Sequence, residues 1–304
     1  MGVEARIILY ARDGEAARAA ARAGFDRMER LEAVMSDYRP ASELMRAGRA
    51  EPGEPVSISD DLFRVLARAR AISQASDGAF DVTVGPLVRL WREARAEGRL
   101  PEPQAIEQAR ARVGWRAMTL DPQHRTLTLA GAGMQLDLGG IGKGFAADEA
   151  LAALRRRGID RCLIDLGGDL ALGEGPPGRV GWRIAVRGGF AEEEPRLIEL
   201  ARAGVATSGD SRQFIELDGE HYSHIIDPRT GRGLTDRLAV TVIAPDAATA
   251  DALASAISVL GEEDGLDLLD RFPCASGLIE RWTPSGIEYR RTADFPAPAG
   301  SKIR

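Results

Sequence analysis

The chain has 304 residues, which is enough to bury a large core as one domain or as two closely joined halves. Its net charge of −6, without a run of basic residues, argues against a nucleic-acid partner. Three histidines and two cysteines far apart in the sequence exclude a histidine-rich metal site and the usual zinc site, and no stretch of about 20 apolar residues predicts a membrane span.

The first half of the chain predicts long helices separated by short strands. Alternating apolar residues predict strands over residues 3–10, 126–129 and 134–136, and helical spacing predicts helices over residues 13–35, 59–73 and 101–113. Asp13 can cap the first helix, and Ser59 or Asp60 can start the second. Tyr38 lies in the loop after the first helix, where it either stacks on a ligand or is an ordinary surface aromatic residue.

A glycine-rich turn stands near the centre of the chain, in the stretch LDLGGIGKGFAADEA over residues 136–150. Close backbone approach to a ligand, or positive φ angles, would be made possible by Gly139, Gly140, Gly142 and Gly144. A helix is predicted over residues 145–157, so its N-terminus favours an anion in the turn. Asp137 and Lys143 flank the turn, which therefore fits a phosphate, a cation held by Asp137, or merely a tight structural connection. It is not a Walker A loop, because glycine rather than serine or threonine follows Lys143.

The second half predicts strands that mostly arrive as hairpins. These strands cover residues 161–166, 170–172, 182–186, 197–201, 205–207, 213–217, 221–226, 239–244, 277–281 and 286–291. Asp218-Gly219 is a hairpin signal, and Asp246 can cap a helix that runs to residue 260. We therefore expect an α+β fold with largely antiparallel sheets and flanking helices, in two intimately joined subdomains. A single functional domain is expected over residues 1–294, followed by a loose tail over residues 295–304.

Three clusters carry residue types suited to chemistry. Asp251 and Ser255 are four residues apart on a predicted helix, so they share a face and form either half of a Mg²⁺ site or an ordinary solvated helix start. His224 lies in a predicted strand and either acts as a general base or is structural. Residues 207–210, TSGD, follow a strand and either donate to a phosphate or form an ordinary turn.

Taken in order, these pieces resemble the FAD:protein FMN transferase (ApbE) family over residues 1–261. The resemblance begins with Met1-Gly2 before the first strand. It continues through SDYRPASEL, SDGAFDVTVGPLVRLW, LDLGGIGKGFAADEA, DLGGD, ATSGD, HIIDPRTG and ADALASAISVLG. Each motif alone is weak, but eight in the family's order make the resemblance specific.

The resemblance implies an enzyme that binds FAD, uses Mg²⁺ and moves the FMN half of FAD onto a threonine or serine hydroxyl of an acceptor protein. The new bond is a phosphoester and AMP is released. By position, His224 matches the base that takes the proton of the acceptor hydroxyl, and Asp137 also belongs to the reacting site. Flavin-nucleotide contacts are matched by Met1, Tyr38, Ala79, Phe80, Asp81, Asp137, Lys143 and Ile225. Metal ligands are matched by Asp251, Ser255 and the carbonyls of Gly140 and Ala254.

Two other functions remain open from the sequence. A Mg²⁺-dependent FAD pyrophosphatase would use the same site, with water in place of the acceptor hydroxyl. A non-catalytic flavin-binding assembly protein is disfavoured, because a pure binder does not need a base.

Relatives commonly carry an export signal ahead of the position of Met1, so the resemblance implies a cell-envelope enzyme that acts on a flavoprotein subunit of an envelope redox complex. Without such a signal the enzyme is expected inside the cell.

Overall fold

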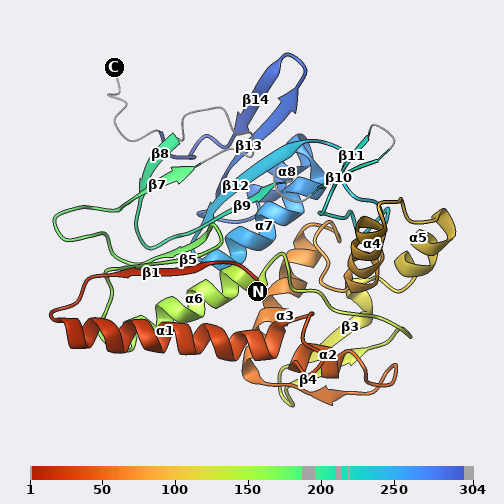
Figure 1. The fold of residues 1–304 in the computed structure, drawn as a ribbon, viewed down its shortest axis with the longest axis horizontal. Coiled ribbons are helices and arrows are strands. Elements are labelled where there is room, and N and C mark those ends of the chain that lie inside the picture. The colour runs from red at the N-terminus through yellow and green to blue at the C-terminus, as the bar shows by residue number, and fades with distance from the viewer. Residues whose placement is uncertain (1, 187–195, 210–213, 218–219, 298–304) are drawn as a thin grey trace.

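A seven-stranded sheet lies at the centre of the computed structural model, which describes residues 2–186, 196–209, 214–217 and 220–297 (Figure 1). In spatial order its strands are β1 (Ala5–Leu9), β5 (Cys162–Leu166), β6 (Asp169–Leu172), β9 (Gly204–Gly209), β12 (Leu238–Ala244), β13 (Ser276–Thr283) and β14 (Gly286–Arg291). Each neighbouring pair is antiparallel. The expected α+β fold with antiparallel sheets is confirmed.

The two faces of this sheet are covered by different layers. In β5, Cys162 and Ile164 pack into the larger apolar core, whereas Leu163 between them packs into a smaller core on the other face. This alternation follows from the two-residue period of a strand. The larger core is closed by α6 (Gly142–Arg155) and α7 (Ala247–Leu260). The smaller core is closed by the hairpin of β7 (Trp182–Val186) and β8 (Arg196–Leu200).

The helix α1 (Gly14–Met35) packs along α6 on the side away from the sheet (Figure 1). Its N-terminus is capped as expected, because the Asp13 carboxylate accepts a hydrogen bond from the backbone N–H of Ala16 at 2.8 Å. Arg27 ties α1 to its neighbours through ion pairs with Asp61 of α3 (Asp60–Ala75), at 2.5 Å, and with Glu149 of α6, at 2.6 Å. These pairs connect the three helices.

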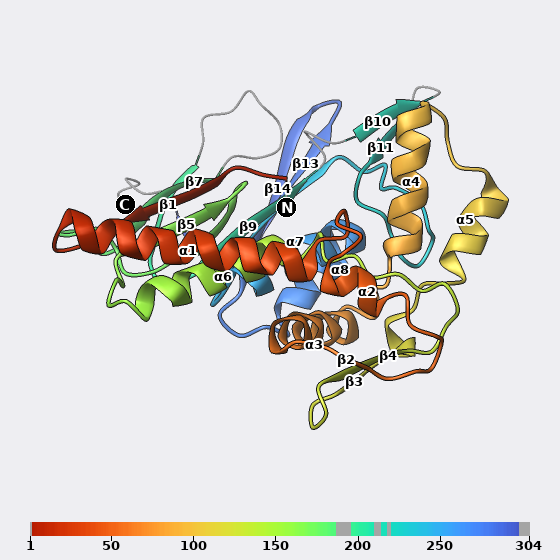
Figure 2. The ribbon, with the colours of Figure 1, turned by 60° about the horizontal axis from the view of Figure 1, so that its bottom comes forward.

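The remaining elements lie toward one end of the molecule and include a three-stranded antiparallel sheet in the order β2-β4-β3 (Figure 2). They are α2 (Glu43–Ala47), β2 (Val56–Ser57), α4 (Gly85–Glu97), α5 (Pro103–Arg110), a 3₁₀ turn (Trp115–Ala117), β3 (Met118–Asp121) and β4 (Thr126–Leu129). The hairpin of β10 (Phe214–Leu217) and β11 (Glu220–Ser223) lies against α4, and α8 (Glu262–Leu269) follows α7. The larger core runs from Ala20 through Leu127 to Ile279, so α2 and the three-stranded sheet share their interior with the main sheet. By contrast, α4 and α5 pack around a third core that contains Leu87, Trp91 and Ile106.

Four sequence expectations need correction. Residues 134–136 do not form a strand, and only Gln135 makes an isolated bridge, to Val84. The central helix begins at Gly142, three residues before the expected start, and residues 207–209 belong to β9 rather than to a turn. Phe295, which was assigned to a loose tail, is only 5% exposed and packs into the smaller core. The hairpin signal at 218–219 lies outside the described residues, although β10 and β11 pair as it predicts.

Within the described ranges, no helix is both long and apolar enough to cross a membrane.

Candidate functional site

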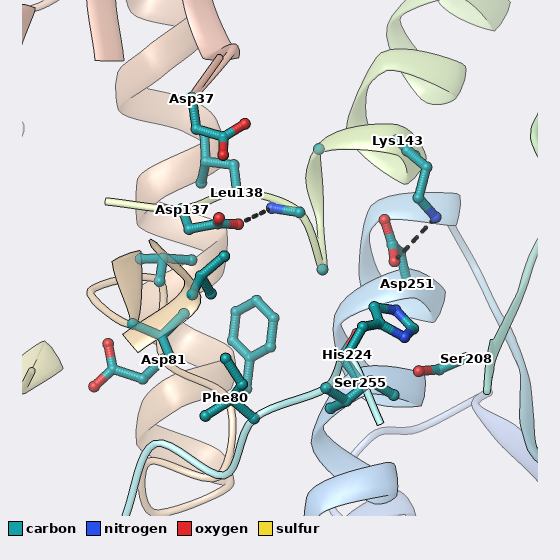
Figure 3. Close-up of a pocket in the computed structure, with 18 of the residues that line it drawn as sticks. Asp37, Phe80, Asp81, Asp137, Leu138, Lys143, Ser208, His224, Asp251 and Ser255 are labelled. Atoms are coloured by element: carbon teal, nitrogen blue, oxygen red, sulfur yellow. Dashed lines mark hydrogen bonds and ion pairs between the residues drawn. The ribbon is translucent and has the colours of Figure 1, made fainter. Parts of the chain in front are cut away.

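A cavity of about 450 Å³ opens beside the central glycine-rich turn (Figure 3). Its wall combines parts of the chain that are far apart in sequence: Val3 before β1, the loop after α1, the turn before α4, one face of α4, the turn before α6, the end of β9, the segment from His224 to Pro228, and one face of α7. Figure 3 shows Asp137 and Phe80 on one side of the cavity and His224, Asp251, Ser255 and Ser208 on the other. A cleft of this size is typical of small-molecule sites.

Gly140 and Gly144 of the central turn serve close packing rather than unusual backbone angles. None of Gly139, Gly140, Gly142 and Gly144 has a positive φ. A Cβ on Gly144 would lie 2.5 Å from the carbonyl carbon of Ala247, so this glycine lets α6 and α7 touch. A Cβ on Gly140 would lie 2.9 Å from the Ser255 hydroxyl, so its backbone rests against that side chain. The backbone therefore does approach other groups closely at these glycines, but at Gly144 the neighbouring group is the backbone of α7 rather than a ligand.

Asp137 is held in place by an ion-pair cluster that the sequence did not predict. Its carboxylate accepts hydrogen bonds from the Gly139 N–H at 2.7 Å and from the Arg92 guanidinium at 3.3 Å. Arg92 also pairs with Asp37 at 2.5 Å, and its guanidinium stacks 4.4 Å from the ring centre of Tyr38. Burial raises the pKa of Asp137 to about 6, repulsion from Asp37 acts in the same direction, and the Gly139 bond and Arg92 oppose both.

Lys143 lies in the first turn of α6 and is committed to two carboxylates. Its amine donates to Asp169 of β6 and lies 3.9 Å from Asp251 of α7. Burial alone would lower the pKa of Lys143, but these two carboxylates outweigh burial and hold the pKa above its ordinary value. Asp169 is 2% exposed and was missed as a site residue, although it ends the DLGGD motif. Lys143 is therefore a fixed positive charge in the wall of the cavity.

The expected metal ligands lie together, with one exception. Asp251 is buried, with one oxygen 3.2 Å from the Gly144 N–H, and Ser255 and Gly140 line the cavity beside it. Ala254 does not line the cavity, and its carbonyl accepts a hydrogen bond from the Ser258 hydroxyl at 2.9 Å. The structure thus brings three of the four expected ligands to one place.

This donor set fits Mg²⁺ rather than a transition metal. The described residues contain no group of three or more His, Cys, Asp and Glu side chains able to hold a metal. One carboxylate, one hydroxyl and a backbone carbonyl leave coordination positions for water and phosphate oxygens, which is the usual arrangement for Mg²⁺. The residues Asp251, Ser255 and Gly140 therefore suit a metal that is shared with a phosphate ligand.

His224 and Ile225 line the cavity directly after β11. The Ile225 N–H donates to the Ser223 hydroxyl at 3.1 Å, which turns the chain at the strand end and presents the next side chains to the cavity. In Figure 3 the His224 ring lies on the side of Asp251 and Ser255. An imidazole in this place can take a proton from a hydroxyl that enters the cavity.

The turn 79–81 contributes an apolar wall. Ala79 and Phe80 are buried and line the cavity, and Figure 3 shows the Phe80 ring directed toward its centre. The Asp81 carboxylate points away in the same view and accepts hydrogen bonds from the backbone of Thr83 and of Trp115, each at 2.8 Å. Burial raises the pKa of Asp81, and these hydrogen bonds oppose the rise. Asp81 thus holds the turn, and Phe80 meets the ligand space.

Of the expected nucleotide contacts, Tyr38, Asp137 and Lys143 also line the cavity, and Met1 lies outside the described residues. Sequence reasoning missed Asp37, Arg92, Arg95 and Asp169. For the two arginines a signal was present, because Val88, Arg92 and Arg95 are spaced by three to four residues and so share one helix face. No local pattern pointed to the partners of Arg92 or Lys143.

The sequence of this chain is similar to those of proteins with known names. The ApbE family profile matches residues 1–278. An FAD:protein FMN transferase of Treponema pallidum (strain Nichols) is 34% identical over 296 residues, which cover 92% of this chain and 82% of that protein. A protein of the same name from Haemophilus influenzae is 35% identical over 276 residues, which cover 87% of this chain and 79% of that one.

Solved structures agree. The flavin transferase ApbE of Vibrio cholerae is similar with a TM-score of 0.87 and 33% identity, covering 97% of this chain and 95% of that chain. The apo form of the flavinyl transferase ApbE of Pseudomonas stutzeri is similar with a TM-score of 0.81 and 31% identity, covering 96% and 95%. The family profile, these relatives and the shared fold show that the chain belongs to the ApbE family and is an enzyme of the FAD:protein FMN transferase kind.

Proposed function

We propose that this enzyme transfers the FMN half of FAD to a threonine or serine hydroxyl of an acceptor protein, with Mg²⁺, and releases AMP. The proposal is carried by the arrangement of one cavity. One side holds a base, His224, and half of a cation site, Asp251 with Ser255, and the opposite side holds an apolar wall at Phe80. FAD has the matching parts, because its ring system is apolar and its pyrophosphate is anionic.

The pyrophosphate of FAD suits the side of the cavity formed by α6 and α7. Lys143 supplies a fixed positive charge there, and its two carboxylate partners keep its amine in one place. Mg²⁺ bound at Asp251, Ser255 and the carbonyl of Gly140 would add positive charge to the pyrophosphate oxygens. The isoalloxazine ring suits the opposite side, where Phe80 and Tyr38 offer aromatic faces.

In the proposed reaction, His224 takes the proton of the acceptor hydroxyl. That oxygen forms a bond to the phosphorus of the FMN half, the bond from this phosphorus to the bridging oxygen breaks, and AMP leaves with the electron pair. A hydroxyl at neutral pH is a weak nucleophile, so a base within reach is needed. Replacement of the hydroxyl by water would give FMN and AMP, which is hydrolysis at the same site.

The test is incubation with FAD, Mg²⁺ and a candidate acceptor domain, read by the intact mass of the acceptor. A gain of one FMN phosphoryl unit that is lost with EDTA supports the proposal, whereas FMN and AMP with an unmodified acceptor indicate hydrolysis. The His224→Ala variant should still bind FAD but lose transfer by roughly 100-fold or more, since general bases contribute about that much. Transfer at the parent rate would remove His224 from the reaction.

We further propose that the acceptor is a flavoprotein subunit of a redox complex in the cell envelope. The support is the resemblance of the chain to a family whose members are commonly exported. Cell fractionation with an antibody against the protein tests the location, and loss of covalent flavin from envelope proteins after deletion of the gene tests the class of acceptor.

A further inference from the structure

One cationic side chain in the wall of the cavity, that of Arg95, has no hydrogen-bond or ion-pair partner among the residues that the structure describes. The lining contains three, at Arg92, Arg95 and Lys143. Arg92 and Lys143 each pair with two carboxylates, as described above. Across the described part of the chain, Arg95 makes no side-chain hydrogen bond or ion pair, and its Nε is fully buried and unsatisfied.

The contrast holds along the helix as well. Arg89 of α4 pairs with Glu93, and Arg99, just after the helix, pairs with Glu97 at 2.5 Å. Arg89 and Arg99 are exposed, and an ion pair at the surface contributes little to stability. Arg95 is instead half-buried and lines the cavity, and its buried Nε–H has no acceptor among the described residues, which is costly for a buried donor. An anionic group that enters the cavity would relieve that cost.

The position of Arg95 indicates which anion this is. The start of α4 touches the segment before the central turn, since a Cβ on Gly85 would lie 2.7 Å from the carbonyl oxygen of Gln135. Arg95 is ten residues further on, about 15 Å along the helix axis. One turn before it, the ring of Trp91 lies 5.6 Å from the ring of Tyr222 on β11. Figure 2 shows the C-terminal end of α4 beside the β10–β11 hairpin.

That hairpin leads directly into His224, the proposed base, and both His224 and Arg95 line the cavity, so an acceptor that brings its hydroxyl to His224 also comes near Arg95. In the proposed function the FAD phosphates lie at Lys143 and the cation half-site, on α6 and α7 rather than at Arg95. We propose that Arg95 is an acceptor-recognition site that binds an aspartate or glutamate carboxylate of the acceptor near its modified threonine or serine. This inference rests on the proposed transfer to a protein hydroxyl.

The guanidinium suits this task, because it holds a carboxylate through two parallel N–H bonds and remains charged at every working pH. Such a contact fixes the acceptor segment in one register relative to His224. It acts on binding of the acceptor and not on the reacting atoms, so its loss should raise KM for the acceptor and leave kcat unchanged.

The experiment uses the full chain loaded with FAD and Mg²⁺, and short labelled peptides with a central threonine. One series carries a single aspartate at each flanking position in turn, a second carries asparagine at the same position, and a third replaces the threonine by valine so that binding is measured without reaction. Binding is read by fluorescence anisotropy and transfer by peptide mass. Arg95→Gln is compared with Arg99→Gln, which removes an arginine outside the cavity.

We expect the parent to prefer an aspartate at one position over asparagine, and Arg95→Gln to lose roughly tenfold in affinity for that peptide only. The preference should weaken with added salt, and FAD affinity should not change. Equal binding of both peptides at every position, or equal behaviour of the two variants, would overturn the inference. Weaker FAD binding in Arg95→Gln would also overturn it, because the anion is then an FAD phosphate. Aspartate preference without transfer would refute the proposed function and leave this site standing.

Discussion

Gly144→Ala tests whether the contact between α6 and α7 builds the catalytic side of the cavity. The new Cβ would lie 2.5 Å from the carbonyl carbon of Ala247 and 2.8 Å from the Cα of Ala248. Carbon atoms in contact are ordinarily about 3.5–4.0 Å apart, so the helices must separate by about 1 Å. Both opposing atoms are backbone atoms, which cannot rotate away.

The magnitude follows from two effects of this separation. Overpacking typically costs about 1–3 kcal/mol, and with an unfolding entropy of about 0.6 kcal/mol per kelvin for a chain of this size, the melting temperature should fall by about 2–5 °C. α6 carries Lys143 and α7 carries Asp251 and Ser255, so the same shift displaces the cation half-site from the lysine. A misplacement of 1 Å can cost roughly 100-fold in rate.

The matched control is Gly142→Ala, two residues earlier in the same helix. Its Cβ would meet only the Cβ of Leu138, at an ordinary 3.7 Å, so its melting temperature should not fall. Differential scanning calorimetry without ligand and a Mg²⁺ titration of transfer should separate the variants. If Gly144→Ala melts and responds to Mg²⁺ like Gly142→Ala, the helix contact does not build the site and the reasoning is refuted.

Three further predictions concern charges in the cavity. Asp251→Ala should lose activity together with its Mg²⁺ dependence, and an unchanged Mg²⁺ titration would remove Asp251 from the metal site. Lys143→Met should destabilise the protein by about 3–5 kcal/mol in chemical denaturation, because it leaves two buried carboxylates without their cationic partner. Adding Asp169→Asn to this variant should restore part of the lost stability but not the activity. The pKa of Asp137 is about 6 in the fold, above its ordinary value, so the ionised form is disfavoured by folding and stability falls as pH rises toward 6. Asp137→Asn should therefore stabilise the apo-protein at pH 7.5 by about 1–3 kcal/mol. The parent should lose FAD affinity below pH 6, where Asp137 becomes protonated, and the variant should not show this pH dependence. Unchanged pH profiles of melting and of FAD binding in the variant would contradict this prediction.

Much of the architecture was predictable from short segments. Asp13 and Asp246 cap their helices as expected, because a capping carboxylate bonds to backbone groups within three residues. The strand β12 was evident from consecutive β-branched and apolar residues. The prediction failed at residues 134–136, where alternation suggested a strand but the backbone pairs only through one bridge. The start of the central helix was also misplaced, because glycines at its first turn look like a turn when their packing partner is unknown.

The same division holds for the site. The sequence by itself pointed to residue types suited to the proposed chemistry, since His224, Asp251 and Lys143 lie in motifs that can be read along the chain. Only the tertiary structure decided how they are paired: Lys143 with Asp169, Arg92 with Asp37 and Asp137, and Gly144 against α7. The partners of Arg92 are 55 and 45 residues away, and Asp251 bonds the Gly144 N–H across 107 residues. Local preferences act over a few residues, whereas the distance between charged groups, their burial and therefore their pKa values are set by how the whole chain packs.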